Sequence, residues 1–147
     1  MDQKVTVITL GVRELERSRR FYVDGLGWEP TMEVPGEVIF IQVAGGQLLA
    51  LWEVSEMARE AGHVGHSAKA PPITIGHNVD SAEDVGRVIN EAVTAGASLI
   101  SPATRTNWGG TNGYFADPDG FRWEVAHNSG FRVTADGKVH MGPIKDH

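Results

Sequence analysis

The alternation of hydrophobic and polar positions predicts a strand, a helix and three more strands over residues 5–53. Residues 5–12 are rich in aliphatic and β-branched side chains, as strands are, whereas residues 13–23 place their apolar positions at helical spacing. Gly25 and Gly27 follow, and glycine is the usual residue where a helix ends. The three later strands are separated by glycine-containing turn sequences and are expected at residues 28–34, 38–43 and 47–53.

The same order of elements returns in residues 73–127. A strand at residues 73–79 precedes a helix at residues 81–95, with Ser81 as its N-cap and acidic side chains in its first turn, where they oppose the helix dipole. Gly96 ends this helix. The three later strands are expected at residues 97–100, 113–116 and 122–127. The chain therefore consists of two βαβββ halves, a repeat that rests on element order and not on residue identity.

These elements predict one domain at residues 1–128, followed by an extension at residues 129–147. The sequence of the extension predicts a hairpin with its turn at Asp136 and Gly137. The parts of the domain are a first module at about residues 5–53, a linker at residues 54–72 with a helical turn at residues 57–60, and a second module at about residues 73–128.

Composition narrows the classes of function. The 147 residues include no cysteine, which excludes disulfides, thiolate zinc sites and a cysteine nucleophile and fits a reducing compartment. Thirteen Lys and Arg against nineteen Asp and Glu give a net charge of −6, which disfavours nucleic acid and anionic membranes as partners. No apolar segment approaches the roughly 20 residues of a membrane span, and the N-terminal residues lack a signal-peptide core. We therefore expect a cytoplasmic protein.

Two short motifs resemble signatures of a known superfamily. Residues 21–27, FYVDGLG, resemble the "FY…LG" motif of the glyoxalase/bleomycin-resistance (vicinal-oxygen-chelate) superfamily, and residues 117–124, DPDGFRWE, resemble its "DPDG…E" motif. The resemblance covers about residues 5–128. It implies an α+β fold in which two βαβββ modules form cupped mixed sheets around one cavity, and it implies a homodimer.

The resemblance also implies where a divalent metal would bind. Metal-using members place a ligand on the first and last strands of each half, and those positions correspond here to Val7, Ala50, Thr74 and Glu124. Valine and alanine cannot donate to a metal, and one carboxylate with one hydroxyl would hold a divalent ion only weakly. The sequence therefore predicts no metal and no other cofactor.

A shift of the alignment is the alternative. His77 and Glu53 each lie three residues beyond an expected ligand position. Because successive side chains of a strand point to opposite faces, a three-residue shift moves a side chain to the other face of the sheet. We therefore expect His77 to face the packed helix and not the cavity.

Strand alternation also predicts the residues that line the cavity. Small and aliphatic residues would enlarge it, and two indoles beside one carboxylate suit a flat, partly apolar molecule with a donor or a positive charge. The alternative is that both tryptophans are core residues that fill it. The expected ligand-binding residues are Val7, Thr9, Leu48, Ala50, Trp52, Thr74, Trp108, Tyr114 and Glu124.

Three interpretations of Glu124 remain open. It could hold an amine or hydroxyl of a ligand, it could be a structural residue paired with a neighbour, or it could act as a general base in an enzyme. Other candidate chemistry is disfavoured. His63 and His66 lie near Glu60, but glycines at 62 and 65 would interrupt a helix there, so a zinc site is not expected. No nucleophilic-serine or phosphate-binding motif is present.

The sequence thus favours a metal-free binding protein that sequesters a small aromatic or cationic compound, as antibiotic-resistance members of the superfamily do. The second hypothesis is an enzyme, a lyase, isomerase or dioxygenase-like member, in which Glu124 is the only candidate catalytic residue. A third is a structural or regulatory protein with a filled cavity. A bound divalent ion would favour the second hypothesis, and a cavity packed by Trp52 and Trp108 the third.

Overall fold

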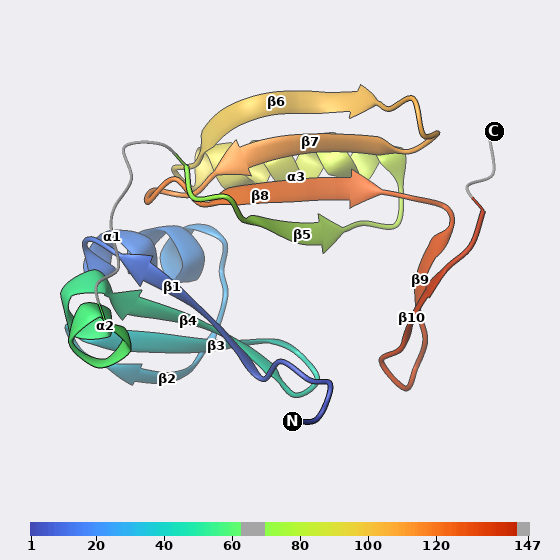
Figure 1. The fold of residues 1–147 in the computed structure, drawn as a ribbon. Helices are drawn as coiled ribbons and strands as arrows, with labels where there is room; N and C mark the ends of the chain where they lie inside the picture. The colour runs from blue at the N-terminus through green and yellow to red at the C-terminus, as the bar shows by residue number, and fades with distance from the viewer. Residues whose placement is uncertain (63–69, 144–147) are drawn as a thin grey trace. The chain divides into compact units, whose positions relative to one another are not determined.

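Two compact units make up the chain. The computed structural model describes residues 1–62 and 70–143, and the chain divides into Met1–Lys69 and Ala70–His147. Each unit contains a four-stranded mixed sheet and one or more helices (Figure 1).

The first unit has the predicted βαβββ order and a further helix. Its strands lie in the order β1-β4-β3-β2, with β1 parallel to β4 and the other neighbours antiparallel. Its elements are β1 (Val7–Val12), α1 (Leu15–Arg19), η1 (Arg20–Gly25), β2 (Pro30–Val34), β3 (Val38–Ala44), β4 (Gln47–Glu53) and α2 (Val54–Ala61).

Alternation along the strands builds the core of this unit. Leu10 pairs with Leu51, and Ile39 of β3 pairs with Leu51 from the other side, so these three side chains share one face of the sheet. All three are almost fully buried, as are Leu15 and Ser18 of α1, a helix that contacts β4. The other face carries Val7, Thr9, Leu48, Ala50 and Trp52.

The predicted helix at residues 13–23 is α-helical only in its first part. After Arg19 it widens into the π-helical segment η1, in which the Leu26 N–H donates to the carbonyl of Phe21, five residues earlier, at 2.9 Å. Phe21 and Tyr22 are both buried there although they are adjacent in the sequence, and their rings meet edge to face at 4.8 Å. Hydrophobic periodicity cannot distinguish this π turn from an α-helix, because both are helical with a similar spacing.

The predicted linker turn at residues 57–60 is part of a longer helix, α2. The helix begins directly after β4, because the Glu53 carboxylate accepts hydrogen bonds from the N–H groups of Ser55, at 2.9 Å, and Glu56, at 3.3 Å. It ends before Gly62, which has a positive φ of 85°. An acidic N-cap at the end of a strand was the signal for this earlier start.

The second unit repeats the order of the first. Its sheet has the order β5-β8-β7-β6, again with one parallel pair, β5 and β8, and antiparallel neighbours elsewhere. Its elements are β5 (Thr74–Asn78), α3 (Ala82–Thr94), β6 (Ser98–Arg105), β7 (Thr111–Ala116), β8 (Arg122–His127), β9 (Phe131–Val133) and β10 (Val139–Met141).

Helix α3 packs on one face of this sheet. It contacts β6, β7 and β8, and its buried side chains are Val85, Ile89 and Ala92 (Figure 1). Ser81 caps it as predicted, accepting the Asp84 N–H at 3.2 Å. Strand β6 is longer than the predicted 97–100, because an edge strand tolerates Pro102 where its pairing with β7 shifts register.

The expectation that His77 faces the packed helix is only half right. His77 pairs with Val125, which is fully buried, so both side chains belong to the α3 face of the sheet. His77 is nevertheless exposed, because it lies on the edge strand β5 and α3 packs over the other three strands. Strand parity predicted its face, but it could not predict how far the helix reaches across that face.

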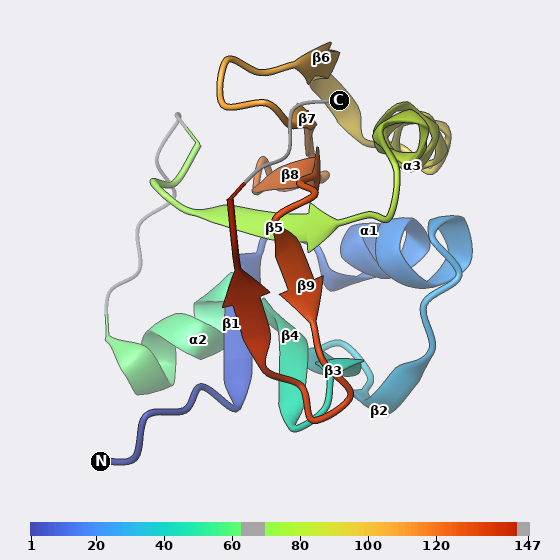
Figure 2. The ribbon, with the colours of Figure 1, turned by 90° about the vertical axis from the view of Figure 1, so that its right-hand side faces the viewer.

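The C-terminal extension forms the expected hairpin. Strands β9 and β10 pair antiparallel, and Gly137, with a φ of 79°, turns the chain between them (Figure 2). None of the helices in residues 1–62 and 70–143 is long and apolar enough to cross a membrane. The α+β fold of two βαβββ modules that the sequence predicts is confirmed.

Candidate functional site

We call the faces that carry the expected ligand-binding residues the front faces of the two sheets. In the first unit, Val7 pairs with Leu48 and Thr9 with Ala50, so their side chains point to the same side. Trp52 follows Ala50 by two residues and joins them. Strand β3 adds Val38 and Phe40, the partners of Trp52 and Ala50. The first front face is therefore mostly apolar, with Thr9 and Gln42 as its polar residues, and carries two aromatic rings.

One polar atom on this apolar face lacks a partner. Within the described residues the Trp52 Nε1 is buried and donates no hydrogen bond. Helix α2 borders the same face, because a Cβ added to Gly11, the pairing partner of Trp52, would lie 3.1 Å from Met57 Sδ. An indole N–H that is buried without an acceptor costs free energy.

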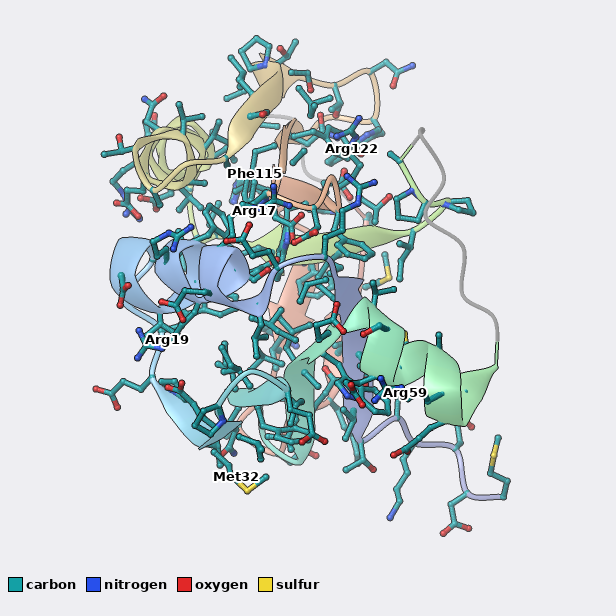
Figure 3. The ribbon with its side chains drawn as sticks, turned by 90° about the vertical axis from the view of Figure 1, so that its left-hand side faces the viewer. Arg17, Arg19, Met32, Arg59, Phe115 and Arg122 are labelled. Atoms are coloured by element: carbon teal, nitrogen blue, oxygen red, sulfur yellow. The ribbon has the colours of Figure 1, made fainter. Side chains whose placement is uncertain are left out.

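The front face of the second unit is polar. Glu124 of β8 pairs with Gly76 of β5 on one side and with Tyr114 of β7 on the other. One step along the strands, Arg122 pairs with Thr74. Figure 3 shows Phe115 on the side of this sheet toward α3 and Arg122 on the other side. The residues of this face are Thr74, Gly76, Asn78, Ser98, Ser101, Thr104, Asn112, Tyr114, Ala116, Arg122, Glu124 and Ala126.

A tight turn sets the register that brings these side chains together. Between β7 and β8, the Asp117 Oδ1 accepts the N–H groups of Asp119 and Phe121, both at 2.9 Å, and Gly120 takes a positive φ of 89°. Only glycine adopts that conformation without strain. The turn fixes Tyr114 opposite Glu124, so the DPDG motif is the device that positions the site.

Glu124 is held through one of its two oxygens. Its Oε1 accepts a hydrogen bond from Asn112 Nδ2 at 2.8 Å and another from the Tyr114 hydroxyl at 2.8 Å. Among the described residues no hydrogen bond is made to Oε2. Hydrogen bonds to an ionised acceptor are the strong ones, so the carboxylate is oriented and its second oxygen is left for a ligand.

The Tyr114 phenol remains a donor across the physiological range. Burial raises the pKa of Tyr114 above its ordinary value of 10.0, and the hydrogen bond to Glu124 and the negative charge of that carboxylate raise the same pKa further. A phenolate beside Glu124 would put two negative charges together. Tyr114 therefore stays a neutral phenol that donates to Glu124.

Space beside Glu124 comes from a glycine. A Cβ added to Gly76, the pairing partner of Glu124 on β5, would meet no atom within 4 Å, and Gly76 has no positive φ. Neither strain nor packing explains the glycine. Its lack of a side chain leaves the approach to the carboxylate open.

Trp108 lies off the strands. It belongs to the loop between β6 and β7, its side chain is 40% exposed, and a Cβ added to Gly110 would lie only 1.8 Å from its ring. The ring therefore rests on the glycine backbone. Sequence alternation placed Trp108 with the ligand-binding residues, but its position is set by this loop contact.

The four positions at which the superfamily holds a metal offer few donor atoms in this chain. Val7 and Ala50 end in hydrocarbon, Thr74 has one hydroxyl, and Glu124 has one oxygen already occupied by two donors. In the described part of the chain no three His, Asp or Glu residues cluster in a way that could hold a metal ion. His63 and His66 lie outside the described residues. These four positions do not fit a divalent metal.

The comparison with protein families decides the relationship. The sequence profile of the Glyoxalase/Bleomycin resistance protein/Dioxygenase superfamily matches residues 4–125. The chain belongs to this superfamily. That match includes residues of all eight strands of the two sheets, ends just after Glu124 and does not extend to the β9–β10 hairpin.

Solved structures of other proteins have the same fold as this chain. A glyoxalase-related enzyme from Fulvimarina pelagi is 40% identical, with a TM-score of 0.84, over 95% of this chain and 99% of that chain. A glyoxalase/bleomycin resistance protein/dioxygenase from Nocardioides is 24% identical, with a TM-score of 0.70, over 86% of this chain and 84% of that chain.

A lactoylglutathione lyase from Agrobacterium tumefaciens is 21% identical, with a TM-score of 0.67, over 86% of this chain and 94% of that chain. At these lower identities the likeness concerns the fold alone. No curated protein matches the chain significantly.

Two residues of the site were missed by sequence reasoning. Arg122 lies two residues before Glu124, so strand alternation alone places it on the same face. Asn112 faces Ala126 and reaches Glu124 diagonally, so it could be found only from the register between β7 and β8.

Proposed function

We propose that this superfamily member binds a small organic molecule through the Glu124 carboxylate, without a divalent metal. The observation that carries the proposal is the convergence of Asn112 and Tyr114 on Oε1, which orients the carboxylate and leaves Oε2 to accept from a ligand. A ligand group that donates, such as an amine or a hydroxyl, fits this oxygen.

The first front face, taken by itself, also has features of a small-molecule site. Trp52 and Phe40, which pair with neighbouring positions of β3 and β4, offer aromatic surface. Apolar walls with a few placed polar groups are typical of small-molecule sites. Sequestration of an aromatic or cationic compound, as in drug resistance, is the form of this function that we infer.

Thermal unfolding of chelator-treated protein tests the proposal. A compound that binds only the native state raises the midpoint with its concentration. We expect stabilisation by organic amines and hydroxy compounds and none by Mn, Fe, Co, Ni or Zn ions. The Glu124→Gln variant should lose the stabilisation by organic compounds. The Glu83→Gln variant, which removes an exposed carboxylate from α3, should keep it. Stabilisation by a metal that Glu124→Gln removes would contradict the proposal.

Catalysis is the second candidate, because an oriented carboxylate with a free oxygen is also what a general base requires. Incubation of the protein with each stabilising compound, followed by mass spectrometry, separates the two. An unchanged compound supports binding, and a product that disappears with Glu124→Gln supports an enzyme. We also propose a homodimer, which light scattering after gel filtration tests directly.

A further inference from the structure

The second front face carries a second charged group beside Glu124. Arg122 is two residues earlier on β8, so its Cα lies about 7 Å from that of Glu124 and its side chain leaves the same face. Among the described residues of this face, only Arg122 and Glu124 are charged. In the described part of the chain neither a hydrogen bond nor an ion pair engages the Arg122 guanidinium.

The two charges are not neutralised by each other. Glu124 directs Oε1 toward Asn112 and Tyr114 instead, both on β7, the strand that lies next to β8 in the sheet. Arg87 of the second unit, in contrast, contacts Asp84 at 2.9 Å and Glu91 at 2.7 Å. A half-buried guanidinium without a partner is costly, and a planar anion can engage two of its N–H groups at once.

The neighbours of this pair add polar groups but no further charge. Thr74 of β5 pairs with Arg122, and Ser101 of β6 pairs with Tyr114. Gly76 leaves open space next to Glu124. Glu124 would attract a purely cationic ligand, but Arg122 would repel it. Arg122 would attract a purely anionic ligand, but Glu124 would repel it.

We propose that Arg122 and Glu124 form one amphoteric subsite, so that the ligand carries a carboxylate or similar planar anion together with a hydrogen-bond donor, as an amino acid or a hydroxy acid does. The inference rests on the proposed function and narrows its ligand class. Arg122 binds the anion, and Glu124 Oε2 accepts from the donor a few ångströms away.

A matched set of compounds tests the subsite. The set consists of an α-amino acid, its carboxamide, which lacks the anion, and the carboxylic acid without the amino group, each prepared with a methyl and with a benzyl side chain. Calorimetric titration should show that the amino acid binds at least about tenfold more tightly than either relative, because each loses one charge-assisted interaction.

Two variants test which residue binds the anion of the ligand and which residue accepts from its donor. Arg122→Met should weaken the amino acid at least about tenfold and leave the carboxamide unchanged, whereas Glu124→Gln should weaken the amino acid and the carboxamide alike. Arg105→Met, which removes an exposed arginine from β6, is the matched control and should change neither. Unchanged thermal midpoints show that the variants are folded.

The outcomes separate the two proposals. If amines bind through Glu124 but the anion adds nothing and Arg122→Met has no effect, the subsite is wrong and the proposed function stands. If no compound of the set binds and no other amine stabilises the protein, the proposed function fails as well. NMR gives an independent readout through the Nε–Hε signal of Arg122. This signal is assigned because it is absent from the spectrum of the Arg122→Lys variant. It should shift with the amino acid and not with the carboxamide.

Discussion

Individual glycines decide both the packing and the openness of the second sheet. Gly113 and Gly76 lie on strands of the same sheet but differ in what surrounds them. A Cβ at Gly113 would lie 2.5 Å from Ile89 Cδ1 of α3, whereas one at Gly76 would meet nothing within 4 Å. The first glycine allows the helix to approach the sheet, and the second leaves space in front of Glu124.

Gly113→Ala is therefore expected to destabilise the protein. The added methyl also meets backbone atoms of Pro102 and Ala103 at 3.0 Å, so moving the Ile89 side chain alone does not relieve the overlap. We expect the free energy of unfolding to fall by about 1–3 kcal/mol in urea titrations. An unchanged midpoint would mean that α3 does not hold this distance from β7 in solution.

Substitution of Gly76 should have the opposite effect on stability. Gly76→Ala should raise the free energy of unfolding by about 0.5–1 kcal/mol, because glycine is unfavourable within a strand. Gly76→Val should block the approach to Glu124 and weaken ligand binding at least about tenfold, without unfolding the protein. Retained affinity in a folded Gly76→Val variant would place the ligand elsewhere.

At the scale of elements, the caps determine where the helices begin. Glu53 is the last residue of β4 and the N-cap of α2, so one carboxylate joins the two elements. Its pKa is lowered from the ordinary value of 4.5, first by the hydrogen bond from the Ser55 hydroxyl and then by the backbone N–H groups of Ser55 and Glu56, which outweigh the effect of burial.

The lowered pKa predicts an acid-sensitive helix. Because the folded state holds the charged form more strongly than the unfolded state does, the contribution of Glu53 is fully present above pH 4.5 and is lost as the pH falls through the lowered folded pKa. Urea unfolding between pH 7 and pH 3, followed by helical circular dichroism, should show a smaller pH dependence in Glu53→Gln. Identical profiles in both proteins would exclude this role.

The sequence predicted most of the elements because their signals are local. Ser81 before an acidic first turn and the DPDG turn each act within a few residues, and both lie where expected. The reach of α3 short of His77 and the Asn112–Glu124 hydrogen bond both depend on contacts between distant segments. A pattern of hydrophobic positions carries no information about such contacts.

At the scale of the whole molecule, the superfamily match extends over both units, from residue 4 to residue 125. We therefore propose that residues 1–128 form a single domain, as the sequence predicts. Each unit contains two tryptophans, Trp28 and Trp52 in the first and Trp108 and Trp123 in the second, so the units can be observed separately.

A single domain should unfold in one transition. Two variants, each with both tryptophans of one unit replaced by phenylalanine, report on the other unit by fluorescence, while far-ultraviolet circular dichroism reports on both. Within each variant the fluorescence and dichroism midpoints in urea should coincide. Separate midpoints in either variant would show that the two units are independent domains.

The two donors that converge on Glu124 Oε1 also constrain how this site could change during evolution. Asn112 Nδ2 and the Tyr114 hydroxyl both donate, so whatever atom replaces Oε1 must accept. In Glu124→Gln the carbonyl oxygen must take that position, and the amide NH₂ is then forced outward. Exchange of one oxygen for one nitrogen thus replaces a hydrogen-bond acceptor on the front face by a hydrogen-bond donor. The same scaffold would then select ligands that accept a hydrogen bond where the parent selects ligands that donate one.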